Sequence, residues 1–261
     1  MKDVNLLVSN GVNVTESLKI FGDMETYDDT LEVFLSEIGR KVSSMSEYKE
    51  TGDMANYAII VHSLKSDAKY FGFDKLAEMA LGHEMESKAG KVQYVNDHYE
   101  ELITEVNKII TLVKQYLIIE PDVEESEETP SQLDVTYNKK TILIVDDSDI
   151  VRSVIEKIFK EEFDLLQAVD GQEAINIISE NKNIDAMLLD LNMPNVDGFG
   201  VLDFLKANNL FVKIPVSIIT GNDETETDKK AFEYPIIDIL KKPFNELSLK
   251  NVIERTINHK K

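Results

Sequence analysis

Residues 141–147, with the sequence Thr-Ile-Leu-Ile-Val-Asp-Asp, constrain the fold more than any other segment. An apolar run of this kind, bounded by polar residues, predicts a buried strand of a parallel sheet. Asp146 and Asp147 come directly after it and therefore lie at the carboxyl edge of the sheet, where open α/β sheets bind their ligands. Adjacent carboxylates repel each other unless a cation joins them, and their hard oxygens suit Mg²⁺.

The chain after residue 140 alternates between short apolar runs and amphipathic segments. The predicted strands are 141–145, 163–168, 184–189, 215–219 and 236–240, and the predicted helices are 148–160, 171–181, 198–208, 224–233 and 245–258. This alternation predicts a doubly wound, five-stranded parallel sheet with helices on both faces. We assign residues 140–261 to this α/β domain.

Residues 1–119 show only helical periodicity and contain no proline. A short helix is predicted over residues 14–21, and Asp23 is the expected N-cap of a long one. Gly52-Asp53 interrupts the pattern, and further helices come after it. Long helices with short connections predict an antiparallel bundle.

Residues 120–139 have a different composition from either neighbour. Six of the nine residues 120–128 are acidic, and no lysine or arginine occurs between Lys114 and Lys139. The segment has no periodic apolar face, so we expect a flexible, self-repelling linker that serves as a spacer.

Composition excludes several classes of function. The net charge of −21 argues against nucleic acid or an anionic membrane surface as a partner, and the lack of cysteine excludes disulfides and thiolate metal sites. No apolar run approaches the length of a membrane span, and the N-terminal sequence does not resemble a signal peptide. We therefore expect a cytoplasmic protein without membrane insertion.

Polar residues also come directly after the later strands of the α/β domain. Asp190 ends the third predicted strand, Thr220 comes after the fourth, and Lys242 comes after the fifth. Together with Asp146 and Asp147, they bring three carboxylates, a hydroxyl and an ammonium group to one edge. A carboxylate can attack phosphorus to form an acyl phosphate, and the remaining groups would neutralise the phosphoryl oxygens.

This set of residues resembles the response-regulator receiver family over residues 140–259. The matching motifs are Asp146-Asp147, Asp190, Met193-Pro194, Asp197-Gly198, Thr220 and Lys242-Pro243. The resemblance implies a flavodoxin-like fold with Asp190 as the phosphoacceptor. It further implies that Asp147, Asp190 and the carbonyl of Asn192 bind Mg²⁺ directly, that Asp146 acts mainly through water, and that Thr220 and Lys242 contact the phosphoryl group.

Two positions refine this resemblance. Lys242 directly precedes Pro243, so we prefer it to Lys241 as the site lysine; the family often has this peptide bond cis. The family usually has an aromatic residue three positions before that lysine, where this chain has Ile239. We therefore expect the aromatic half of the usual switch to be absent.

A second candidate site lies on the helix around residues 58–71. His62 is flanked at helical spacing by Lys65, Ser66 and Lys69, so we expect an imidazole, a small residue and two ammonium groups on one exposed face. Such a face suits an Nε2 nucleophile, because the small residue gives access and the cations neutralise an incoming phosphoryl group. Spacing alone leaves open a merely structural histidine.

The sequence around His62 resembles a histidine-phosphotransfer domain over roughly residues 10–117. The matching segments are His62-Ser63-Leu64-Lys65, Phe71-Gly72 and Leu76-Ala77-Glu78-Met79-Ala80. The resemblance implies a four-helix bundle with His62 as phosphoacceptor. Ser66 stands where the family usually has glycine, and Asp67 adds a negative charge that the site does not need. We expect His83, His98 and His259 to be solvated, and no histidine-based metal site.

These features predict a phosphorelay protein in which His62 and Asp190 exchange phosphoryl groups with partners, the receiver site holding Mg²⁺. The expected partners are a sensor histidine kinase and other receiver or phosphotransfer proteins, since the sequence shows no nucleotide-binding motif of its own. One alternative is an adaptor in which only Asp190 is phosphorylated and the bundle is an inactive docking module. A third hypothesis is a Mg²⁺-dependent phosphohydrolase with Asp190 as nucleophile.

Overall fold

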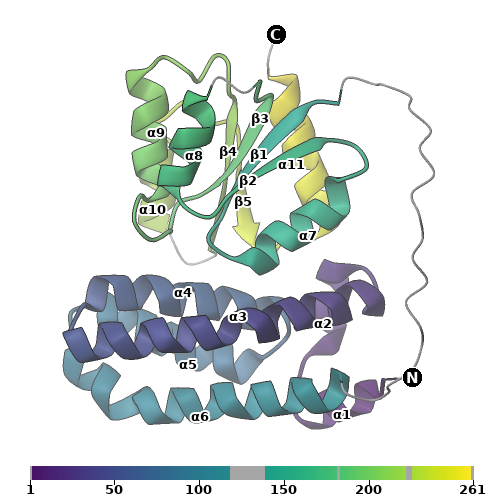
Figure 1. The fold of residues 1–261 in the computed structure, drawn as a ribbon, viewed down its shortest axis with the longest axis vertical. Coiled ribbons are helices and arrows are strands. Elements are labelled where there is room, and N and C mark those ends of the chain that lie inside the picture. The colour runs from purple at the N-terminus through teal and green to yellow at the C-terminus, as the bar shows by residue number, and fades with distance from the viewer. Residues whose placement is uncertain (1, 118–138, 181–182, 222–224, 260–261) are drawn as a thin grey trace.

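The computed structural model describes residues 2–117, 139–180, 183–221 and 225–259. A helical domain precedes an α/β domain, and Figure 1 shows the helices below the sheet. The predicted fold classes are confirmed: a helical region first, then a parallel α/β sheet. All of the predicted linker except residue 139 lies outside the described residues.

The described part of the helical domain has six helices, one more than a short helix followed by a four-helix bundle. They are α1 (Val4–Ser9), α2 (Val14–Phe21), α3 (Met24–Thr51), α4 (Met54–Tyr70), α5 (Asp74–Lys88) and α6 (Val92–Leu117). The sequence analysis did not predict α1, which is only six residues long and has one fully buried side chain, Leu7. Helices this short carry too few turns for a periodic signal.

Local capping explains where the long helices begin and end. Asp23 accepts a hydrogen bond from the backbone N–H of Thr26 at 2.8 Å and starts α3. Gly52 adopts a left-handed conformation with φ of 72° and ends it, and Asp53 then caps α4 by accepting from Asn56 N–H at 3.1 Å. These short, fixed turns reverse the chain and produce the antiparallel bundle.

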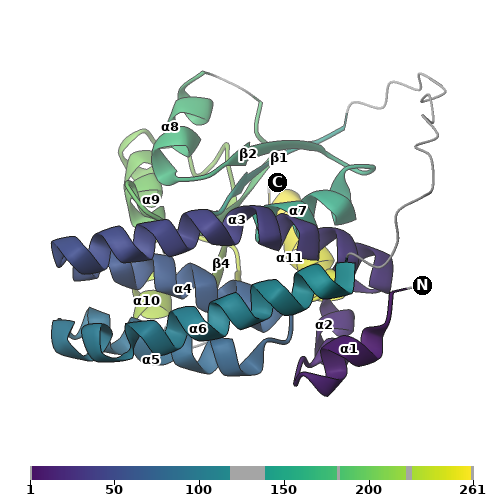
Figure 2. The same ribbon diagram turned by 60° about the horizontal axis from the view of Figure 1, so that its bottom comes forward.

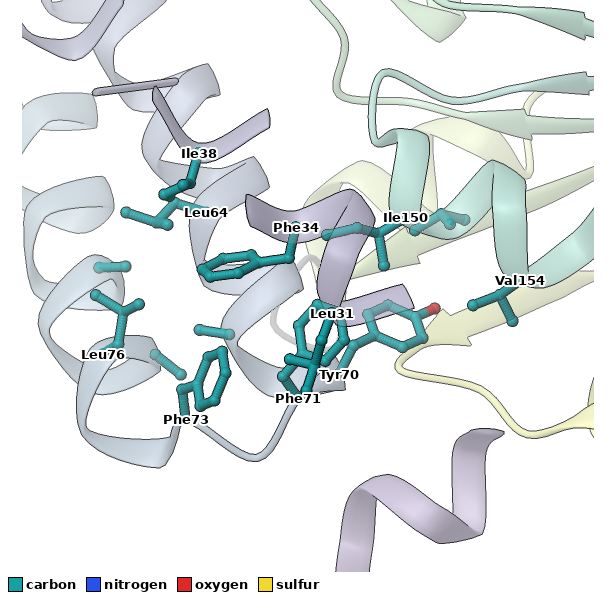
Figure 3. Packing of buried hydrophobic residues seen from close by; sticks show 14 of the residues in the cluster. Leu31, Phe34, Ile38, Leu64, Tyr70, Phe71, Phe73, Leu76, Ile150 and Val154 are labelled. Carbon is teal, nitrogen blue, oxygen red and sulfur yellow. The ribbon is translucent and has the colours of Figure 1, made fainter. Parts of the chain in front are cut away.

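Aromatic side chains fill the end of the bundle near α2. The ring of Phe71 lies 5.5 Å from those of Phe21 and Phe34 and 5.6 Å from that of Phe73, measured between ring centres. Figure 3 shows Phe34, Phe71 and Phe73 within one buried cluster. This packing fixes the C-terminal end of α4 and hence the position of the whole helix.

The α/β domain has a five-stranded parallel sheet with strand order β2-β1-β3-β4-β5. The strands are β1 (Thr141–Val145), β2 (Asp164–Ala168), β3 (Ala186–Asp190), β4 (Val216–Gly221) and β5 (Ile239–Lys242). The helices are α7 (Asp149–Phe159), α8 (Gly171–Ser179), α9 (Gly198–Ala207), α10 (Thr225–Ala231) and α11 (Glu246–Asn258). Helices α7 and α11 cover one face and α8 and α9 the other (Figure 1).

The helical domain lies against the carboxyl edge of this sheet. Figures 1 and 2 both show α3 running beside α7, and these two helices are in contact. The ring of Tyr70 from α4 packs edge-on against Phe244 with the ring centres 5.8 Å apart. Figure 3 shows Tyr70, Ile150 and Val154 in the same apolar cluster, so the buried core continues across both domains.

His83 is buried, which corrects the expectation of a solvated histidine. Only 2% of it is exposed, and its Nδ1 lies 2.8 Å from the hydroxyl of Tyr57 on α4. The periodicity of α5 alone did not reveal this partner. Burial lowers the pKa of His83 from its usual value of 6.5.

The buried imidazole makes the helical domain sensitive to acid. The unfolded chain protonates His83 at a higher pH than the folded chain, so its contribution to stability is complete above pH 6.5 and is lost as the pH falls through the lowered pKa. NMR titration of the histidine rings should show His83 titrating below pH 6.5. The free energy of unfolding should fall less on acidification in His83→Gln than in wild type. An equal fall would contradict this assignment, and His98→Gln serves as the control.

Among the glycines of the bundle, Gly72 leaves the least room for a side chain. Its φ is 71°, and a Cβ there would lie 2.5 Å from the backbone oxygen of Asn13. Gly72→Ala should therefore destabilise the chain by more than the ~1 kcal/mol of a left-handed alanine, because the clash adds to it. Gly52→Ala is the matched control, since φ is 72° there but no atom lies within 4 Å. Equal shifts of the urea midpoint in the two variants would contradict this contact.

Candidate functional site

Three carboxylates meet at the carboxyl edge of the sheet. β1 and β3 are neighbours in register, with Val145 opposite Leu189, so the next residues of the two strands lie side by side. One ligand oxygen from each of Asp146, Asp147 and Asp190 lies within 4.8 Å of the others. Asp146 is fully buried, Asp190 is 1% exposed and Asp147 is half-buried.

Lys242 neutralises part of this charge. Its Nζ lies 2.6 Å from Oδ2 of Asp190 and 2.7 Å from Oδ2 of Asp146. Lys241 instead forms an ion pair with Asp228 and donates to the backbone oxygen of Gly221. The structure thus places Lys242 at the acids and Lys241 away from them. The Lys242-Pro243 peptide bond is cis.

Thr220 and Asn192 occupy neighbouring positions. Thr220 is fully buried near the end of β4, whose register pairs it with Lys241 of β5. The backbone N–H of Asn192 donates to Oδ1 of Asp190 at 3.1 Å. The loop after β3 is therefore held close to the predicted phosphoacceptor, while the role of the Asn192 carbonyl stays a prediction.

The acids carry more negative charge than one lysine balances. Burial and repulsion from Asp146 and Asp190 raise the pKa of Asp147 to about 7. Burial also raises the pKa of Asp190, against the attraction of Lys242. Burial by itself lowers the pKa of Lys242, but the carboxylates outweigh it and hold that pKa well above its usual value. A cluster of oxygen donors with excess negative charge fits Mg²⁺, with Asp146, Asp147 and Asp190 as the residues that would hold it.

His62 lies on α4 with its ring oriented by a carboxylate. Its Nδ1 is 2.7 Å from Oε1 of Glu84 on α5. An ionised carboxylate only accepts hydrogen bonds, so Nδ1 carries the hydrogen of the neutral ring and Nε2 carries the lone pair. The arrangement therefore prepares Nε2 as a nucleophile.

Glu84 is a site residue that the sequence analysis missed. It lies 2.6 Å from the Nζ of Lys65 and 2.7 Å from that of Lys88. Burial alone would raise the pKa of Glu84, but hydrogen bonds from His62, Lys65 and Lys88 outweigh it and hold this pKa well below its usual range. Glu84 is 22 residues from His62 in the chain, and only its four-residue spacing to Lys88 was visible in the sequence.

The predicted exposed face of α4 is in fact mostly buried. Every residue from 61 to 68 is buried, including His62, Lys65 and Ser66, and Lys69 is half-buried. The reason is that α4 is covered on one side by the bundle and on the other by the α/β domain. Lys65 was expected to face an incoming phosphoryl group, but the structure shows it in an ion pair with Glu84.

Asp67 also has a different role from the one expected. It forms an ion pair with Lys41 of α3 and accepts a hydrogen bond from the hydroxyl of Ser148 in the α/β domain at 3.0 Å. Its negative charge is therefore compensated within the interface. Neither partner is near Asp67 in the sequence, so spacing along α4 gave no signal.

The two candidate sites face each other. Burial raises the pKa of Asp190, and Lys242 and a protonated His62 ring oppose this rise, so His62 is close enough to Asp190 to interact with it electrostatically. A cavity of about 290 Å³ beside them is lined from both domains, by Lys41 and Ser63 on one side and Asp147 and Pro194 on the other. Burial raises the pKa of Tyr70, whose ring enters from α4 near Lys242. The structure thus brings the residues of both predicted sites to one interface.

Two protein families match separate parts of the chain. The Hpt domain family matches residues 29–114, and the response regulator receiver domain family matches residues 142–254. Among solved structures, the receiver domain of the Francisella response regulator 1452 is 29% identical, with a TM-score of 0.43; the match covers 47% of this chain and 100% of that one.

Curated relatives match over part of their length. A cyclic di-GMP phosphodiesterase of Thermotoga maritima is 34% identical over 106 residues, which are 40% of this chain and 27% of that protein. The sensor histidine kinase CheAY of Helicobacter pylori is 29% identical over 160 residues, 60% of this chain and 20% of that protein. The chain thus spans between 20% and 27% of these relatives.

Among the residues that the structure describes, no helix has the length and apolar character needed to cross a membrane. The family matches fall on the two domains that the fold separates, and each contains one of the candidate sites. The chain therefore has an Hpt domain followed by a response regulator receiver domain.

Proposed function

We propose that a phosphoryl group passes between His62 and Asp190 of the same chain, with Mg²⁺ at the receiver acids. The observation that carries this proposal is the burial of both residues at one interface, beside a cavity that both domains line. Reacting groups held together in this way need little further help, because phosphoryl transfer depends mainly on positioning and on charge neutralisation.

The transfer needs no proton to move. As the phosphoryl group leaves His62, the P–N bond breaks and its electron pair stays on Nε2. A carboxylate oxygen of Asp190 forms the new P–O bond. The hydrogen on Nδ1 remains hydrogen-bonded to Glu84 throughout, so the departing imidazole is neutral. The reverse transfer takes the same path.

Receiver residues would stabilise the charge on the transferring group. Lys242 already contacts Asp190, and its ammonium group would pair with a phosphoryl oxygen. Thr220 would donate its hydroxyl to another oxygen. Mg²⁺ bound by Asp146, Asp147 and Asp190 would supply Lewis-acid neutralisation of the same oxygens.

The phosphoryl group would enter from a partner. A sensor histidine kinase is one candidate, because a relative of this chain carries that name. Other receiver or Hpt proteins are the second class. A cytoplasmic location would suit all of these partners.

The first test is phosphorylation of the full chain by a small acyl phosphate with Mg²⁺. Wild type should carry alkali-labile label on Asp190 and acid-labile label on His62. Asp190→Asn should lose both labels, because the donor reacts at the receiver first. His62→Gln should lose only the acid-labile label, and chelation of Mg²⁺ should remove both.

The outcomes of this test separate the hypotheses. Alkali-labile label alone in wild type would contradict transfer within the chain and favour the adaptor, in which the Hpt domain only docks. Steady hydrolysis of a generic phosphoester would favour the phosphohydrolase. Transfer within one chain should also have a rate that does not change on dilution.

Glu84→Gln tests the orientation of His62. The amide still accepts from Nδ1–H but has no charge, and a charge-assisted hydrogen bond is about twice as strong as a neutral one. We expect the transfer rate to His62 to fall about tenfold while labelling of Asp190 is unchanged. Glu86→Gln is the matched control, because Glu86 lies on the same helix and pairs with Lys91 at the bundle surface. Equal transfer rates in the two variants would refute a role for Glu84.

A further inference from the structure

A buried polar link joins the two domains at Asp67. Its Oδ1 accepts from the hydroxyl of Ser148 at 3.0 Å, and its Oδ2 pairs with Lys41. Lys41 also donates to the hydroxyl of Ser63 at 3.0 Å. Asp67 and Ser148 are each 1% exposed and Lys41 is 6% exposed, so docking removes all three from water.

Ser148 is held in place by the receiver domain itself. Its backbone N–H donates to Oδ1 of Asp146 at 3.0 Å, and its hydroxyl oxygen accepts from the N–H of Val151 at 3.3 Å, which caps α7. A hydroxyl has one hydrogen, and here that hydrogen is directed to Asp67. The hydrogen-bond donor to Asp67 is thus the side chain of the residue that directly follows Asp146-Asp147.

Two further ion pairs between described residues of the two domains lie at the rim. Lys157 pairs with Asp29 at 2.8 Å and Arg40 with Asp149 at 3.6 Å, and the side chains of Asp29 and Arg40 are 59% and 68% exposed. Exposed ion pairs of this kind contribute little. A buried carboxylate that loses its hydrogen-bond donor destabilises the docked state, because it has given up its hydrogen bonds to water and has no protein donor in their place.

We propose that Asp67 is a specificity residue, which selects the receiver domain of the same chain as the docking partner of α4 by requiring the hydroxyl donor of Ser148. The proposal rests on the proposed function only in that docking presents His62 to Asp190. Lys41 belongs to the Hpt domain and compensates the charge of Asp67 with any partner. Ser148 is the receiver's half of the link, so it carries the discrimination.

The chemistry of this link defines which receivers fit. A receiver with an apolar side chain in place of Ser148 leaves Oδ1 of Asp67 buried without its donor. A receiver with an acidic side chain there brings two carboxylates together. A receiver with a hydroxyl group at that position satisfies Asp67 and docks.

Ser148→Asp is the sharpest variant. Aspartate caps helices as well as serine does, so α7 should keep its start. The introduced carboxylate would face Asp67 and repel it. Adding Asp67→Asn to the same chain supplies an amide donor and should restore the contact. Asp29→Asn is the control, because it removes one carboxylate, as Asp67→Asn does, but from an ion pair at the rim.

Docking is measured on the full chain by small-angle X-ray scattering, with the mass checked by light scattering and the helix content by circular dichroism. Wild type, Asp29→Asn and the double variant should be compact monomers. Ser148→Asp and Asp67→Ala should have a larger radius of gyration at unchanged helix content. Equal radii in wild type and Ser148→Asp would overturn the proposal. A wild type with the mass of a dimer would overturn selection of the same chain.

The same variants, labelled by the small acyl phosphate, separate this proposal from the proposed function. Transfer from Asp190 to His62 should fall about tenfold in Ser148→Asp and recover in the double variant. A wild type that never labels His62 would refute the proposed transfer. The scattering result would still decide whether Asp67 selects the docking partner.

Discussion

Helix α4 lies between the Hpt bundle and the carboxyl edge of the receiver sheet, and this burial governs the groups at both sites. Each charged group there has lost water and needs a partner of opposite charge. Lys242 meets Asp146 and Asp190, and on the other side Glu84 meets Lys65 and Lys88. The pKa directions result from these pairs and from burial: burial raises that of Asp190, and hydrogen bonds lower that of Glu84.

The two sides of the interface are arranged for different tasks. On the Hpt side, Glu84 holds the hydrogen on Nδ1 of His62, so the lone pair of the neutral ring is on Nε2. On the receiver side, Lys242 contacts two of the three acids, and the oxygens of all three lie close enough together to bind a divalent cation. A phosphoryl group between them would meet cationic groups from the receiver and a neutral leaving group from the Hpt domain. This division of charge suits transfer in either direction.

Docking itself combines an apolar contact with a selective polar one. Tyr70 packs on Phe244, and the apolar cluster continues into α7, which provides area without discrimination. The hydrogen bond between Ser148 and Asp67 would add a requirement for a hydroxyl donor, which a receiver without one at this position does not meet. Ser148 also caps α7 and donates to Asp146, so the docking contact directly follows the acids of the predicted phosphorylation site in the chain.

The sequence by itself determined the order of the domains, the presence of five strands and the positions of Asp146, Asp147, Asp190 and Lys242, although β5 begins at Ile239, three residues later than predicted. Parallel strands bring the residues at their carboxyl ends to one edge of the sheet, so a motif in register predicts a site. Tertiary structure alone decided the pairing of His62 with Glu84, of Asp67 with Lys41 and Ser148, and of His83 with Tyr57. These partners come from different helices, and the periodicity of one helix shows which side faces its own bundle but not what a second domain covers. For that reason the face of α4 that was expected to be exposed proved to be buried.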